Sequence, residues 1–106
     1  MTLQELNEVL SAAFPGKVAY RAFPETDVPE MPYVIINEQQ TDNFAADNRV
    51  YHKRMMVDIE LYTKIKSKAT EQTLEDALDA AQIFYNATDL YLDDERCFER
   101  IYSIEV

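Results

Sequence analysis

The segment 49–63 alternates between apolar and polar residues over a longer stretch than any other part of the chain. Its apolar positions are Met55, Val57, Ile59 and Leu61, and its polar positions include Arg54, Asp58 and Glu60. Because successive strand side chains point to opposite faces, this pattern predicts a strand with one face in the core. Strands usually contain about five or six residues. We therefore expect the first half of this strand to project beyond the core as an arm or one limb of a hairpin.

A helix is predicted over residues 3–13. Thr2 and Glu5 have the spacing of a capping box, and apolar residues recur at helical intervals until Pro15 and Gly16 end the pattern. A short strand over 18–23 follows. Three prolines within residues 24–32 interrupt backbone hydrogen bonding, so this stretch is expected to be a connecting loop.

Residues 33–36 form a β-branched and aromatic run that predicts a strand buried on both faces. The following residues, 39–48, are mostly polar, which predicts a long exposed loop. Phe44 is the one aromatic residue in this stretch. An exposed phenyl ring of this kind needs a covering surface.

A second helix is predicted over 70–86, with Thr70 as its N-cap and a basic linker, residues 64–69, before it. Its apolar stripe is expected to end in Phe84 or Tyr85. The expected solvent-facing residues are Glu71, Glu75, Asp76 and Asp79. Strands are predicted over 88–92 and 96–106, joined by a turn at Asp93 and Asp94, with one face of the last strand formed by Phe98, Tyr102, Ile104 and Val106.

The order of these elements lacks the regular strand and helix alternation of a parallel doubly wound sheet. It predicts an α+β fold: an antiparallel or mixed sheet of four to five strands, with two helices packed on one face and a protruding loop or hairpin. The chain has 106 residues, which suits one hydrophobic core. We expect residues 1–106 to form a single domain.

The net charge of −10 disfavours nucleic-acid binding, because affinity for phosphates comes mainly from Lys and Arg. The basic residues are concentrated in 49–68, between acidic flanks. This distribution favours either head-to-tail association of identical copies or a solvated strand face and linker.

No apolar run reaches the ~20 residues of a membrane span, and the N-terminus lacks the pattern of a signal peptide. With a single cysteine, Cys97, the sequence suits a reducing cytoplasm.

Residue types that carry chemistry are sparse. His52 is the only histidine and Gly16 the only glycine, so neither a histidine metal site nor a glycine-rich phosphate loop is predicted. The acidic pairs Asp93–Asp94 and Glu75–Asp79 fit solvated positions better than an acid–base role. Cys97 is expected to be a structural thiol. We therefore predict no catalytic, cofactor or metal site, and no enzymatic activity.

Several segments together resemble the small tail proteins of long-tailed bacteriophages and prophages of Gram-positive bacteria. They are Met31-Pro32-Tyr33-Val34-Ile35-Ile36, the stretch from Asp42 to Tyr51, Asp58-Ile59-Glu60-Leu61-Tyr62-Thr63, Leu74-Glu75-Asp76-Ala77-Leu78-Asp79, Ile83-Phe84-Tyr85, and the closing run from Arg100 to Val106. Within this class, the chain is similar to the tail-terminator or tail-completion proteins. The basic linker departs from the more acidic linker associated with that group.

The resemblance implies a structural protein that forms a homo-oligomeric ring, usually a hexamer, capping the tail tube where it meets the head. Implied partners are tail-tube and head–tail connector proteins, with no membrane and no sequence-specific nucleic acid. The implied location is the bacterial host cytoplasm during assembly, then the tail or neck of the virion. Residues expected at the interface between copies are Asn43, Phe44, Asp47, Arg49 and Tyr51. Two alternatives stay open: a host adaptor or regulatory module that binds another protein, and a small enzyme whose acidic residues converge only in the folded chain.

Overall fold

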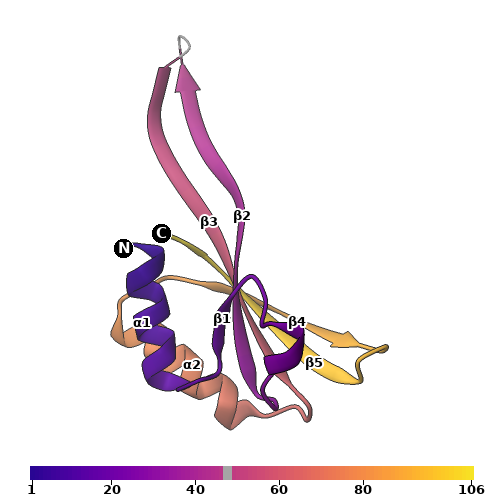
Figure 1. The fold of residues 1–106 in the computed structure, drawn as a ribbon. Helices are drawn as coiled ribbons and strands as arrows, with labels where there is room; N and C mark the ends of the chain where they lie inside the picture. Colours follow the sequence, from indigo (N-terminus) through magenta and orange to yellow (C-terminus); the bar gives the residue numbers. More distant parts are fainter. Residues whose placement is uncertain (47–48) are drawn as a thin grey trace.

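A computed structural model describes the backbone of residues 1–46 and 49–106, and the side chains of residues 1–39 and 55–106. Two helices and five strands follow one another along this part of the chain (Figure 1). They are α1 (Leu3–Ala13), β1 (Val18–Tyr20), β2 (Tyr33–Ala46), β3 (Arg49–Thr63), α2 (Lys68–Ala80), β4 (Asn86–Leu92) and β5 (Cys97–Glu105), with a 3₁₀ turn at Glu25–Asp27. None of the helices in the described ranges is long and apolar enough to cross a membrane.

The five strands form one mixed sheet in the order β1-β2-β3-β5-β4. The short strand β1 is parallel to β2, whereas β2–β3, β3–β5 and β4–β5 are antiparallel pairs. Both helices lie on the same side of the sheet (Figure 1). The α+β fold expected from the sequence is therefore confirmed.

The hydrophobic core lies between the two helices and one face of the sheet. The helices contribute Leu6, Leu10, Leu74 and Leu78, and the strands contribute Val34, Ile36, Val57, Ile59, Leu61, Tyr102 and Ile104. The alternation predicted for 49–63 is confirmed where side chains are described, since Asp58 and Glu60 occupy the opposite face from this core. The prediction that 33–36 is buried on both faces is wrong. Tyr33 and Ile35 are only half-buried, because α1 and α2 both lie on the other side of the sheet.

The outer parts of β2 and β3 leave the body together as a two-stranded arm (Figure 1). On one side, β1 pairs only with residues 34–36 of β2, and on the other, β5 pairs with β3 only from Met56 onward. The predicted projection of β3 is therefore confirmed. The predicted loop over 39–48 is wrong, because β2 continues to Ala46 and residues 47–48 lie outside the described residues. Ladder hydrogen bonds to β3 satisfy the backbone of this polar stretch even without a core beneath it.

The capping box predicted for α1 is confirmed: Thr2 Oγ1 accepts from the Glu5 backbone N–H at 3.1 Å, and Glu5 Oε1 accepts from the Thr2 N–H at 3.2 Å. The N-cap predicted for α2 is wrong by three residues. Ser67 is the N-cap, and its hydroxyl accepts from the backbone N–H of Thr70 at 3.2 Å. Thr70 therefore lies in the first turn, and the linker shortens to residues 64–67.

The predicted end of α2 is also wrong, since the helix ends at Ala80 instead of continuing to 86. Gln82 takes a left-handed backbone conformation with φ of 59°, and the Ile83 N–H donates to the Leu78 carbonyl at 2.9 Å. The Gln82 N–H donates to the Asp79 carbonyl at 3.0 Å. These two bonds form a Schellman motif, which stops a helix without glycine or proline. Phe84 consequently lies outside the helix and is 83% exposed.

Smaller boundary differences have local causes. The strand predicted over 18–23 ends at Tyr20, because Arg21 has a positive φ of 69°. The last strand begins at Cys97 and not at residue 96, since Arg96 belongs to the turn and has a φ of 52°. The predicted turn at Asp93 and Asp94 is confirmed. On β5, Tyr102 and Ile104 share the core-facing side as expected.

Candidate assembly surfaces

The arm brings together the backbone positions of four residues expected at an interface. Asn43 and Phe44 lie on the outer part of β2, where their partners across the ladder are Lys53 and His52. Arg49 pairs with Ala46, and Tyr51 lies beside these pairs on β3. Asp47 lies outside the described residues. The four described positions therefore share one ribbon that the body of the chain does not cover (Figure 1).

The sheet face opposite the helices carries three acidic residues, Asp58 and Glu60 on β3 and Glu99 on β5, which we call the carboxylate cluster. Asp58 accepts hydrogen bonds from Gln39 Nε2 at 2.5 Å and from Ser103 Oγ at 2.9 Å. Glu60 accepts from Asn37 Nδ2 and from the Tyr62 hydroxyl, each at 2.8 Å. Donors on β2, β3 and β5 thus satisfy the carboxylates of Asp58 and Glu60.

Glu99 is the most enclosed member of the carboxylate cluster, with 8% of the residue exposed. Burial raises its pKa, the negative charge of Glu60 adds to this increase, and a hydrogen bond from Tyr62 opposes it. Burial and the carboxylates of Glu60 and Glu99 in turn raise the pKa of the Tyr62 hydroxyl. Burial and the neighbouring carboxylate of Glu60 therefore favour the protonated form of Glu99.

A second polar group lies on the helix side and joins α2 to the outer strands. Arg100 Nη1 contacts Asp89 Oδ1 at 2.8 Å, and Arg100 Nε contacts Glu75 Oε2 at 3.4 Å. Lys66 Nζ contacts Glu71 Oε2 at 2.6 Å and Asp89 at 3.1 Å. The hydrogen bond from Arg100 lowers the pKa of Asp89. The expectation that Glu71 and Glu75 face solvent is wrong, because both approach Arg100 from the first turns of α2.

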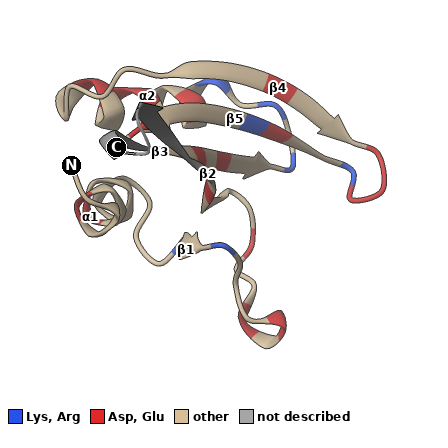
Figure 2. Cartoon of the chain, turned by 90° about the horizontal axis from the view of Figure 1, so that it is seen from above, with Lys and Arg blue, Asp and Glu red and all other residues tan. Residues whose placement is uncertain are grey.

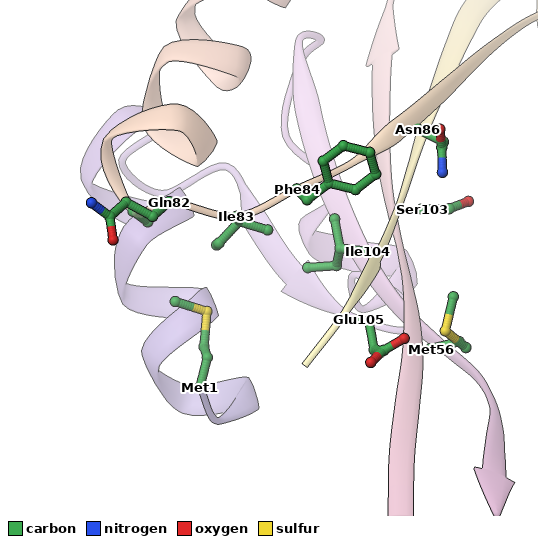
Figure 3. Close-up of a pocket in the computed structure, with 10 residues that line it drawn as sticks. Met1, Met56, Gln82, Ile83, Phe84, Asn86, Ser103, Ile104 and Glu105 are labelled. Atoms are coloured by element: carbon green, nitrogen blue, oxygen red, sulfur yellow. The ribbon is translucent and has the colours of Figure 1, made fainter.

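An open hollow of about 540 Å³ lies where the end of α2, the start of β4 and the base of the arm meet. Figure 3 shows Met1, Ile83 and Ile104 around this space, beside the ring of Phe84. Phe84 is 83% exposed, and Met1 is 49% exposed. The lining is mixed, because Gln82, Asn86, Ser103 and Glu105 lie beside these apolar side chains, and the exposed Phe84 ring makes the hollow a candidate contact surface.

The residues considered for chemistry are separate in space. Cys97 is buried, and burial raises the pKa of its thiol, as suits a structural cysteine. Asp93 and Asp94 are exposed in the turn after β4, away from Glu75 on α2. Across the described ranges, no three His, Cys, Asp or Glu side chains are grouped so that they could hold a metal ion.

No family model matches the chain, and no curated protein matches it. Among solved structures, its fold is similar to that of a chain in the virion of a native gene transfer agent particle. The TM-score is 0.64 and the sequence identity 14%, and the match covers 95% of this chain and 84% of that chain. At this identity the likeness shows a shared fold over nearly the whole length of the chain.

The carboxylate cluster and the exposed Phe84 did not follow from the sequence. Glu60 and Glu99 stand 39 positions apart in sequence, and only the β3–β5 register places them on adjacent strands. The spacing of the apolar residues predicted that Phe84 belongs to the apolar stripe of α2. In the structure, the Schellman motif at Gln82 ends the helix before Phe84, so Phe84 lies outside that stripe. The left-handed residue has no sequence signal, because glycine is absent there.

Proposed function

We propose that this protein is a non-enzymatic structural subunit of a phage-like virion, acting as a tail-terminator or tail-completion protein at the head-proximal end of the tail tube. The observation that carries the proposal is the fold shared with a chain of the gene transfer agent virion. The sequence resemblance to small tail proteins supports the same role. In this role, copies of the chain form a homo-oligomeric ring, and the ring binds tail-tube and head–tail connector proteins.

The shape of the molecule suits assembly into a ring. The body is a sheet with two helices, and the arm extends the molecule to 49 Å along its longest axis against 30 and 25 Å along the others. An arm that packs on a neighbouring copy makes a head-to-tail contact, which closes into a ring when the rotation between copies is right. Asn43, Phe44, Arg49 and Tyr51 on the arm, with Asp47, are the proposed contact residues.

The charge of the chain also fits a passage for DNA. The net charge is −10, and acidic surfaces repel phosphates. A ring with this charge lets DNA pass through its centre without holding it. A sequence-specific DNA-binding protein carries the opposite charge on its contact surface.

The oligomeric state is the first test. Light scattering across a range of protein concentrations, followed by negative-stain electron microscopy, is expected to show a ring. The Phe44→Ala, Tyr51→Ala double variant is expected to shift the protein toward monomer while its circular dichroism stays unchanged. A matched control, Tyr20→Ala, changes a 44%-exposed tyrosine on the body and is expected to leave the ring intact.

The biological role is tested by removing the gene from a phage or prophage that encodes it. Loss of the protein is expected to give tails of irregular length or tails detached from heads, and complementation is expected to restore both. Normal particles without the protein would contradict the proposal. A protein that stays monomeric and binds a host protein instead would support the adaptor role.

A further inference from the structure

We propose that the free edge of β4 is the surface that receives the arm of the next copy, by addition of the outer part of β3 to the sheet. This inference rests on the proposed function, because the occupant is a second copy of the chain. The proposed function does not say which surface of one copy binds the arm of the next, and this inference identifies that surface. Four observations support it: the unprotected edge of β4, the apolar side chains along it, the unpaired edge of β3 and the charges of the two segments.

β4 is the last strand of the sheet, and in the described part of the chain it pairs only with β5. All seven of its residues form a continuous ladder with β5, without a register shift. Edge strands of monomeric proteins are usually short, bulged, or protected by lysine or proline. β4 has none of these features, and its single charged residue, Asp89, already contacts Arg100 and Lys66. The opposite edge strand, β1, has only three residues.

Apolar side chains accompany this edge on both faces. Six of the seven residues of β4 are exposed, and they include Leu90 at 44% and Tyr91 at 52%. Leu90 pairs with Glu99 on the face opposite the helices, whereas Tyr91 pairs with Phe98 on the helix face. Phe84 and its hollow lie immediately before the strand. A strand added here would cover apolar side chains as well as satisfy backbone groups.

The outer part of β3 provides a suitable strand. Residues 49–54 pair with β2 on one side, and pairing on the other side begins with the Val106 N–H, which donates to the Met55 carbonyl at 3.0 Å. Their other edge therefore has no strand partner among the described residues. The ladder to β2 shifts register beside Tyr51. We therefore expect addition to β4 over a few residues instead of its full length.

The charges of the two strands of the arm indicate that β3, and not β2, is added to the β4 edge; we call the outer part of β3, residues 49–54, the β3 limb. The outer part of β3 contains Arg49, Lys53 and Arg54 and no acidic residue, whereas the outer part of β2 contains Asp42 and no basic residue. β4 leads directly into the exposed acidic run Asp93, Asp94 and Glu95, at the far end of the β4–β5 hairpin (Figure 2). Over the whole chain, residues 40–54 carry a net charge of +1 and the remainder carries −11. A basic limb is therefore attracted to the acidic end of this edge.

The contact joins two different surfaces, so each copy offers one arm and one β4 edge, and the contact can repeat around a ring. Pairing of β4 with β4 of another copy would use the same surface twice and give a two-fold dimer. Reversing the charge of the β3 limb is therefore expected to disrupt the ring contact but not β4–β4 pairing, which does not use this limb.

The test uses two variants of the full chain. The turn variant, Asp93→Lys, Asp94→Lys, Glu95→Lys, has a basic turn and a basic limb, and the limb variant, Arg49→Glu, Lys53→Glu, Arg54→Glu, has an acidic limb and an acidic turn. We expect each variant alone to lose the ring in light scattering at concentrations where the wild-type protein assembles. An equimolar mixture is expected to restore it, because each limb then meets a turn of opposite charge.

The matched control is Glu8→Lys, Asp76→Lys, Asp79→Lys, which changes the net charge as much as the turn variant does, at exposed positions on the two helices. It is expected to assemble like the wild-type protein. Hydrogen–deuterium exchange provides a second readout, in which the backbone amides of residues 86–92 are expected to exchange several-fold more slowly in the ring than in the monomeric variants.

Rings formed by both variants alone, or no recovery in the mixture, would overturn the β4 edge as the receiving surface while leaving the proposed ring intact. A two-fold dimer with protected β4 amides would likewise overturn it in favour of β4–β4 pairing. A wild-type protein that is monomeric at every concentration and does not bind tail-tube or connector proteins would instead refute the proposed function.

Discussion

The hydroxyl of Tyr102 on β5 donates a hydrogen bond to Glu75 Oε2 on α2 at 2.8 Å. Arg100 Nε donates to the same hydroxyl at 2.9 Å, so the phenol connects a carboxylate to a guanidinium. Tyr102 is completely buried, and burial together with the Glu75 hydrogen bond raises the pKa of its hydroxyl. This contact fastens α2 to the strand beneath it.

Tyr102→Phe is expected to lower the free energy of unfolding by about 1–2 kcal/mol, because Glu75 and Arg100 lose a partner in a partly enclosed position. Urea unfolding followed by circular dichroism measures this. Tyr91→Phe is the matched control, since Tyr91 is 52% exposed, and it is expected to change stability by less than about 0.5 kcal/mol. Equal effects of the two substitutions would contradict a special role for the Tyr102 hydroxyl.

Arg100→Met is expected to destabilise the fold by about 2 kcal/mol, because Glu71, Glu75 and Asp89 then lose a shared cation. Arg100→Lys keeps the charge but not the planar fork, so it is expected to cost less. In Arg100→Met the pKa of Asp89, which the Arg100 hydrogen bond lowers, is expected to rise toward its ordinary value. An NMR titration of the Asp89 carboxyl carbon measures this shift, and an unchanged pKa would show that Arg100 does not control it.

Glu99→Gln is expected to stabilise the protein at neutral pH. The pKa of Glu99 is raised from its ordinary value of 4.5, so the folded chain holds this proton more tightly than the unfolded chain. The stability contributed by Glu99 is therefore complete below its unfolded-state pKa and is lost as the pH rises through the folded-state pKa. The neutral amide removes this loss.

Thermal unfolding from pH 4 to pH 8 tests this expectation. The gain in stability from Glu99→Gln is expected to be largest at the upper end of the range and to shrink toward pH 4. Glu25→Gln is the control, at an exposed glutamate in the loop after β1. A gain that does not depend on pH would point to the volume or polarity of the side chain instead of its ionisation.

Gln82→Gly is expected to stabilise the protein by up to about 1 kcal/mol, because glycine adopts the left-handed conformation at the end of α2 without the steric cost of a Cβ atom. Gln82→Ala retains that atom and is expected to give no comparable gain. Differential scanning calorimetry of the two variants compares them directly. A gain from alanine as large as that from glycine would show that the left-handed backbone carries no cost at this position.

Local sequence patterns were sufficient to predict the helices and strands whose formation depends on residues close together in the chain. The capping box of Thr2 and Glu5 and the alternation of 49–63 predicted α1 and β3 correctly, because both signals act between residues a few positions apart. The lack of strand and helix alternation predicted the α+β class. The alternating segment 49–63 is longer than a usual strand, and this length predicted that part of it projects from the body as an arm.

What only the tertiary structure decided depends on partners far apart in sequence. Polar residues 39–46 form a strand because β3 lies beside them, and Glu71 is covered because Arg100 and Lys66 meet it across the fold. Phe84 is exposed because a left-handed residue ends α2 early. The unprotected edge of β4 exists only once the strand order is known, since a sequence shows which residues form a strand but not which strand is left without a neighbour.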